Sequence, residues 1–183
     1  AEFSIIHREQ RYRVVIYNDI DGYSAVLRRG TEFIPEWITL GFPRFYLPHL
    51  LFGGIEGSTE VLKGGLVIIA GRPSSGKTTT CYSLINEVLN RVPWAALTIE
   101  DPVEIVLPRT YENGSIVSQR EVISKDFAQA LRLALRGNHN LIMTGEIRDS
   151  YGVLLALEAA QTGHMVVTTF HGTDIMTVIE RFV

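Results

Sequence analysis

Residues 71–78, which read GRPSSGKT, constrain the fold of this chain more than any other segment. The segment matches the phosphate-binding pattern G-x-x-x-x-G-K-[ST] at every fixed position. A short apolar run, residues 66–70, precedes it, and apolar side chains recur at helical spacing through the following residues 78–91. The alternative is a glycine-containing turn that binds nothing, but a strand before the loop and a helix after it favour a phosphate site.

The residue types in the loop point to a nucleotide and a magnesium ion. Gly71 and Gly76 allow the backbone to curl so that its N–H groups face a phosphate, and the start of the following helix adds positive potential. Lys77 supplies a positive charge for the β- and γ-phosphates, and Thr78 supplies a hydroxyl ligand for Mg²⁺. The residues predicted to bind ATP are Gly71, Ser74, Ser75, Gly76, Lys77, Thr78 and Thr79.

Beyond the loop, short apolar runs alternate with segments of helical spacing. Phe127, Leu131 and Leu135 share one face of a helix that Gly137 is expected to close, and Asp149 is expected to cap a helix that ends at Gly163. This alternation predicts an α/β fold with a parallel sheet. The predicted strands are residues 66–70, 94–99, 141–145 and 165–170, and the predicted helices are residues 78–91, about 127–135 and 149–162.

The chain divides into three zones that differ in hydrophobic pattern and in proline and glycine content. Residues 1–30 read as strands, because charged and bulky residues alternate on either side of a turn at residues 18–22. Residues 31–64 contain several prolines and glycines and read as a linker. Residues 65–183 form the predicted α/β core.

Composition excludes several classes of protein. Hydrophobic residues make up 46% and charged residues 20%, so the chain can bury enough apolar surface to fold. The net charge of −3 lacks the basic excess of a general polyanion binder. Cys81 is the single cysteine, which rules out an internal disulfide framework and fits a reduced, cytosolic setting. The chain begins at Ala1 without a signal peptide or a long apolar run, and we expect it to be a piece of a longer protein.

Carboxylates follow two of the predicted strands directly. Glu100, Asp101 and Glu104 come after residues 94–99, and Glu146 comes after residues 141–145. The carboxyl ends of parallel strands border the crevice where such sheets bind ligands. We expect Glu146 to orient the attacking water and one of the other three carboxylates to support the metal ion, and the pattern alone leaves open which one. The predicted metal ligands are Thr78, Glu100 and Glu146.

Two histidines, His164 and His171, bracket the last predicted strand. Either of them is a candidate for the nucleotide site, and a purely structural role is the alternative for both.

Four sequence blocks together resemble a known family. They are residues 71–79, residues 98–104 (TIEDPVE), residues 145–149 (GEIRD) and residues 162–171, which begin TGH and end TFH. The blocks resemble, in order, the phosphate loop, acidic box, atypical Walker B motif and histidine box of the motor ATPases of type IV pilus, type II secretion and related conjugation or type IV secretion machines. Residues 119–122 and 130–136 also resemble the segment between the second and third blocks of this PilT-like class.

The resemblance implies a RecA-like ATPase core after part of a small PAS-like domain in residues 1–30. It also implies that Arg13 and Arg28 reach nucleotide phosphate as the domains close, with ordinary surface arginines as the alternative. His164 and His171 would sense the state of the nucleotide. The chain departs from the family at Arg72–Ser74, at Asn138–Asn140 and at Gly172, and none of these changes removes a mechanistic group.

The function expected from this resemblance is Mg²⁺-dependent ATP hydrolysis by a homo-oligomeric ring, a hexamer. The ring would act with a platform protein at the cytoplasmic face of the bacterial inner membrane, and no nucleic-acid partner is expected. Two rival functions stay open: a nucleic-acid translocase on the same core and a nucleotide-binding scaffold without catalysis. Glu146 separates the scaffold from the enzyme, because a protein that only binds nucleotide has no need to place this carboxylate.

Overall fold

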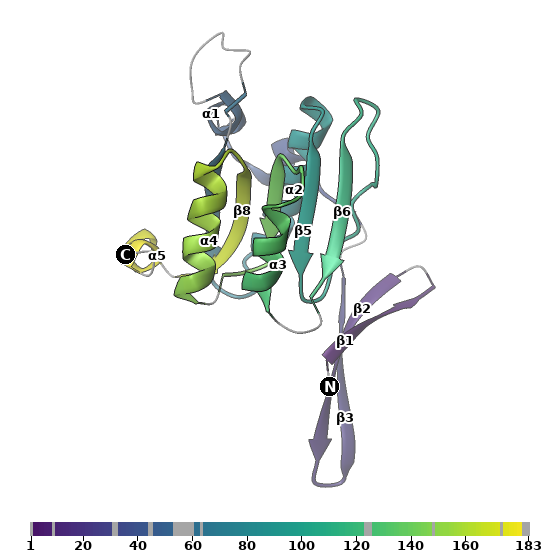
Figure 1. Cartoon of the computed structure of the whole chain (residues 1–183). Coiled ribbons are helices and arrows are strands. Elements are labelled where there is room, and N and C mark those ends of the chain that lie inside the picture. Colours follow the sequence, from purple (N-terminus) through teal and green to yellow (C-terminus); the bar gives the residue numbers. More distant parts are fainter. Residues whose placement is uncertain are drawn as a thin grey trace.

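A computed structural model describes residues 2–8, 10–30, 33–43, 46–52, 61–62, 64–122, 126–147, 149–172 and 174–180. Two parts are visible in Figure 1: a sheet with helices on both faces, and a smaller sheet of the first strands that projects away from it. Among the described residues, no helix has the length and apolar character needed to cross a membrane.

The core is built on a five-stranded sheet in which every pair of neighbouring strands is parallel. All four predicted strands belong to it, which confirms the α/β prediction. The fifth, an edge strand, was not predicted from the sequence. In spatial order the strands are β4 (Gly65–Gly71), β8 (Met165–His171), β7 (Leu141–Thr144), β5 (Ala95–Glu100) and β6 (Ile116–Glu121).

Helices cover both faces of this sheet, as the alternation of side chains along its strands requires. On β7, Leu141 and Met143 pack into one hydrophobic cluster with the helix after the phosphate loop, α2 (Lys77–Arg91). Ile142 points to the opposite face, where α3 (Phe127–Ala134) and α4 (Ser150–Gln161) complete a second cluster. Figure 1 shows α3 and α4 in front of the sheet and α2 behind it.

The helix α2 is more deeply buried than an amphipathic surface helix, because a second layer covers it. This layer consists of the 3₁₀ helix η1 (Trp37–Leu40) and of α1 (Tyr46–Phe52). Trp37, Leu47 and Leu51 belong to the same buried cluster as α2. The described part of the segment expected to be a linker therefore packs on the core.

The first three strands form a separate antiparallel sheet of β1 (Glu2–His7), β2 (Gln10–Asp19) and β3 (Gly22–Arg29). The predicted turn joins β2 to β3, and every residue of β3 is exposed. One end of this sheet contacts the core, where Arg11 Nη1 donates to the carbonyl oxygen of Val103 at 3.2 Å. This contact brings one face of β2 toward the carboxyl end of β5.

The predicted helix ends are confirmed for α4 and wrong for α3. The carboxylate of Asp149 caps α4 by accepting from the backbone N–H of Gly152 at 2.7 Å, and Gly163 ends it with φ of +103°. In contrast, α3 ends at Ala134, and Gly137 does not take the left-handed conformation. Gly137 N–H instead donates to the carbonyl of Ala134 at 2.9 Å in a tight turn. A short helix that was not predicted, α5 (Ile175–Glu180), follows β8.

Candidate functional site

A cavity of about 350 Å³ opens at the carboxyl ends of β4, β5, β7 and β8, bounded on one side by the N-terminal sheet. It gathers most of the side chains predicted from the sequence, although they come from segments that are far apart along the chain. The predicted residues that line it are Arg13, Arg28, Ser74, Gly76, Lys77, Thr78, Thr79, Glu100, Asp101, Glu104, Glu146 and His171.

The phosphate loop has the conformation that its glycines predict. Gly76 ends the loop with φ of +91°, a value that glycine adopts without strain. A Cβ on Gly71 would lie 2.7 Å from Oγ of Ser75, so a side chain here would force the Ser75 hydroxyl to move. Lys77 Nζ donates to the carbonyl oxygen of Arg72 at 2.8 Å, which holds the ammonium group over the loop.

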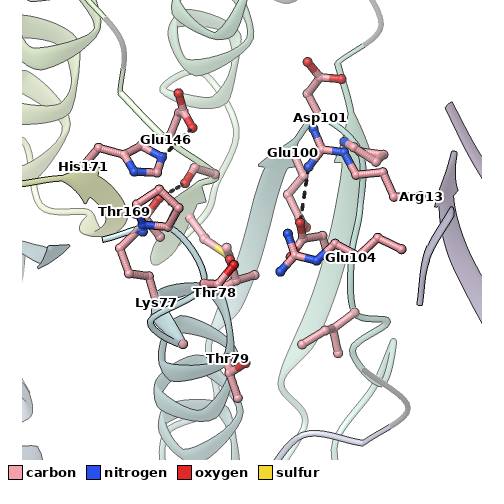
Figure 2. A pocket seen from close by; sticks show the side chains of 18 of the residues that line it. Arg13, Lys77, Thr78, Thr79, Glu100, Asp101, Glu104, Glu146, Thr169 and His171 are labelled. Atoms are coloured by element: carbon pink, nitrogen blue, oxygen red, sulfur yellow. Dashed lines mark hydrogen bonds and ion pairs between the residues drawn. The ribbon is translucent and has the colours of Figure 1, made fainter. Parts of the chain in front are cut away.

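Glu146 faces His171 across the cavity, with 3.6 Å between Oε2 of the carboxylate and Nε2 of the ring. Figure 2 shows the two side chains pointing toward one another above Lys77. The backbone just before Glu146 is fixed, because the hydroxyl of Thr169 on β8 donates to the carbonyl of Gly145. The predicted motif of residues 145–149 also includes Arg148, which lies outside the described residues.

Arg13 brings positive charge to the cavity from the N-terminal sheet. Its Nη1 lies 3.4 Å from Oε1 of Glu104, and this ion pair, drawn in Figure 2, links the sheet to the loop after β5. Arg28 is paired with Arg13 in the antiparallel register, so both side chains lie on the same face of the sheet. Both arginines line the cavity together with Lys77.

Glu100 is only 3% exposed, although it belongs to the cavity wall. Its Oε1 accepts from the Thr98 hydroxyl at 2.6 Å and from Gln119 Nε2 at 3.3 Å, and its Oε2 accepts from the Tyr82 hydroxyl. Burial raises the pKa of Glu100, and the hydrogen bonds from Thr98, Tyr82 and Gln119 oppose that rise. The pKa of Tyr82 is also raised, first by burial and then by the neighbouring Glu100 carboxylate.

The oxygen atoms in the cavity fit a magnesium ion held largely by phosphate and water. Mg²⁺ usually binds nucleotide phosphates through one or two protein oxygens and keeps several waters. The Thr78 hydroxyl and the Glu146 carboxylate line the same cavity as Lys77 and match that need. Within the described ranges, no group of three or more His, Cys, Asp and Glu side chains is arranged as a metal cage, which such a site does not require.

The structure does not bring His164 to this cavity. His164 precedes β8, whereas His171 ends it, and a strand of seven residues separates them by about 20 Å. Nδ1 of His164 lies 3.1 Å from the carbonyl oxygen of Ala159 at the end of α4. Within one chain, His164 therefore contacts the end of α4. Of the two histidines that were candidates for the nucleotide site, only His171 lies at the cavity.

Some residues at the site carried no clear signal in the sequence. Tyr82 lies between the positions that mark the apolar stripe of α2, and Gln119 lies in a strand with few apolar residues. Both reach the buried Glu100. Only the packing of α2 and β6 against β5 brings them together.

Comparison with known proteins gives a consistent set of relatives. Residues 59–183 match the family described as type II/IV secretion system protein. The chain is 37% identical over 175 residues to a twitching motility protein of Neisseria gonorrhoeae and 36% identical over 176 residues to the type IV pilus retractation ATPase PilT of Pseudomonas aeruginosa. Each alignment covers 94% of this chain but only 43% and 47% of the two relatives, so the chain spans about half of their length.

Solved structures agree with these sequence matches. A crystal structure of the pilus retraction motor PilT with bound ADP superposes with a TM-score of 0.84 at 36% identity, covering 100% of this chain and 50% of that one. The Legionella pneumophila ATPase DotB superposes with a TM-score of 0.82 at 30% identity, covering 99% of this chain and 49% of its own. Because the coverage is nearly complete, the likeness includes the N-terminal sheet as well as the parallel core.

Proposed function

Because this chain belongs to the type II/IV secretion system protein family, we propose that it is the catalytic part of an Mg²⁺-dependent motor ATPase. The observation that carries the proposal is the arrangement around one cavity, where Lys77 and Thr78 at the start of α2 face Glu146 and His171. A nucleotide-binding scaffold would need Lys77 and Thr78 but would not need Glu146 and His171. The RecA-like parallel sheet supplies both pairs from the carboxyl ends of its strands.

In this proposal the phosphate loop holds the β- and γ-phosphates of ATP through its backbone N–H groups and Lys77. Glu146 accepts a hydrogen bond from the attacking water and orients it toward the γ-phosphate. His171, at 3.6 Å, keeps the Glu146 carboxylate directed into the cavity. Thr78 and Glu146 would hold the magnesium ion, directly or through water, and the ion would neutralise charge that develops on the phosphates.

Arg13 and Arg28 are proposed to add positive charge from the N-terminal sheet as the two parts close on ATP. Charge contributed by a second structural unit couples nucleotide binding to motion, since it gives the closed form a higher affinity than the open form. The described residues of the connector, 33–43 and 46–52, would move with the core, because Trp37, Leu47 and Leu51 are buried against α2. Residues 1–30, a PAS-like unit, would then move relative to residues 31–183.

At the level of the assembly, we propose a homo-oligomeric ring, a hexamer, that acts on a platform protein at the cytoplasmic face of the inner membrane. The relatives' names support a role in a pilus or secretion machine, since they include pilus retraction and assembly ATPases and a type II secretion protein E. ATP hydrolysis would drive pilus assembly, retraction or export. Nucleic acid is not expected as a partner, given the net charge of −3.

The direct test is phosphate release from ATP by the full chain, with ADP binding measured in parallel by calorimetry. We expect turnover in the presence of Mg²⁺ and its loss when EDTA removes the metal, because the positive charge of Lys77 does not offset the charge of the phosphates without the ion. Binding of ADP without any hydrolysis would leave the scaffold as the function. Strong stimulation by single-stranded DNA that falls with salt would instead indicate the translocase.

A second prediction concerns the arginines of the N-terminal sheet. Arg13→Ala and Arg28→Ala are each expected to lower ATP turnover severalfold, about 3- to 10-fold, because a charge-assisted contact to phosphate is lost. Steady-state ATPase assays measure this effect, and circular dichroism checks that the core stays folded. Arg136→Ala, an exposed arginine after α3, is the matched control and should keep wild-type turnover. Full activity in both test variants would mean that these arginines are ordinary surface residues.

A further inference from the structure

The loop after β5, residues 101–107, lies outside the sheet ladder and carries two of the carboxylates that line the cavity. We call it the acidic loop. The backbone N–H of Leu107 donates to Oε1 of Gln119, a side chain of another element, at 2.7 Å.

Gln119 belongs to a hydrogen-bonded group with Tyr82 and Glu100. The Tyr82 hydroxyl donates to the Glu100 carboxylate, and Gln119 Nε2 lies 3.3 Å from the same carboxylate. Gln119 Nε2 also donates to the Ile105 carbonyl at 2.9 Å, so one amide group holds the loop by both a donor and an acceptor. Tyr82 comes from α2, Glu100 from β5 and Gln119 from β6, and together we call them the clamp.

The clamp is buried, which makes its hydrogen bonds consequential. Tyr82 is 0% exposed and Glu100 is 3% exposed. A buried polar group that loses its partner cannot replace it with water at low cost, so removing one member of the clamp disturbs the others. A carboxylate offers about four acceptor positions, and Glu100 already accepts hydrogen bonds from Thr98, Tyr82 and Gln119.

The opposite side of the acidic loop contacts the N-terminal sheet. Arg11 Nη1 donates to the Val103 carbonyl at 3.2 Å, and Arg13 pairs with Glu104 at 3.4 Å. Gly30 passes so close that a Cβ there would lie 3.0 Å from the carbonyl oxygen of Glu104. The acidic loop therefore lies between the clamp and the strands that bring arginines to the cavity.

We propose that Tyr82 and Gln119 are positioning residues that hold the acidic loop, together with Glu100, in the geometry that ATP hydrolysis requires. Through the loop they direct Asp101 and Glu104 into the cavity. Glu100 supports the loop by anchoring Tyr82 and Gln119. The catalytic part of this proposal rests on the ATPase activity proposed above.

The test uses the full chain and two variants that remove polar groups while conserving volume. Gln119→Met removes both hydrogen-bonding groups of the amide, and Tyr82→Phe keeps the buried ring and removes only the hydroxyl. We expect kcat for ATP to fall about tenfold or more in each variant, with KM within about twofold of wild type. Without nucleotide, hydrogen exchange at the Leu107 amide should become about tenfold faster in Gln119→Met.

Tyr111→Phe is the matched control, because Tyr111 also donates to a side chain of α2, Asn86 at 2.9 Å, but lies outside the clamp. It should keep wild-type kcat and wild-type exchange at Leu107. Unchanged exchange in Gln119→Met would overturn the clamp, whether or not the protein hydrolyses ATP. Faster exchange with unchanged kcat in both variants would overturn the positioning role and leave the ATPase assignment intact. A wild-type chain without turnover would refute that assignment, and with it the catalytic role of the clamp.

Discussion

Glu146→Gln is expected to leave ATP bound and to slow its hydrolysis by about 100- to 10,000-fold. The amide keeps the size of the side chain but loses the negative charge that orients and polarises the attacking water. It also weakens the contact with His171 at 3.6 Å. Phosphate release under single-turnover conditions measures the chemical step, and calorimetry with ATP confirms that binding persists.

Glu112→Gln makes the same chemical change at an exposed turn near the opposite end of the sheet, so it should retain full turnover. If Glu146→Gln kept more than about half of the wild-type rate, Glu146 would be a structural residue. The water-orienting role would then pass to Glu100, Asp101 or Glu104, which line the same cavity.

Lys77→Ala is expected to abolish tight ATP binding. Lys77 is held over the phosphate loop by its 2.8 Å bond to the Arg72 carbonyl, so its charge is already in place for the phosphates. Loss of a charge-assisted contact of this kind costs about 1.5–3 kcal/mol, which corresponds to roughly a 10- to 150-fold loss of affinity. Isothermal titration with ATP and Mg²⁺ measures the change.

Arg91→Ala is the control for this variant, because it removes one positive charge from the far end of the same helix. Arg91 is exposed and pairs with Glu87 within α2, an interaction of little energetic consequence. Equal affinity for ATP in Lys77→Ala and Arg91→Ala would argue against nucleotide binding at the phosphate loop.

Strands rich in apolar residues could be predicted from the sequence. Residues 141–145 and 165–170 became the central strands β7 and β8, which are buried on both faces. The continuous apolar run of residues 66–70 became β4, an edge strand that is only half-buried. The edge strand β6 carries only one buried apolar residue, Val117, among polar neighbours, so hydrophobic pattern alone could not reveal it. The strands were therefore predictable where apolar residues run together, even at the edge position of β4, and not in β6, where most residues are polar.

The direction of a strand predicts which of its ends borders the site, and residues at that end could be found from the sequence. Glu100 and Glu146 follow their strands and reach the cavity wall, as expected for the carboxyl ends of a parallel sheet. His164 comes before β8, at the amino end, and the same rule would have separated it from His171. Tyr82 and Gln119 could not be found in this way, because their role depends on contacts between elements that are distant in sequence.

The acidic loop has a consequence for how this protein loses activity under stress. Its order comes from side chains on α2 and β6, since the loop lies outside the ladder of the sheet. Cooperative units open with different free energies, and a segment held by tertiary contacts opens more readily than a core strand. On warming, the cavity should therefore lose its catalytic shape before the helices melt, so that enzymatic inactivation precedes the change in far-ultraviolet circular dichroism.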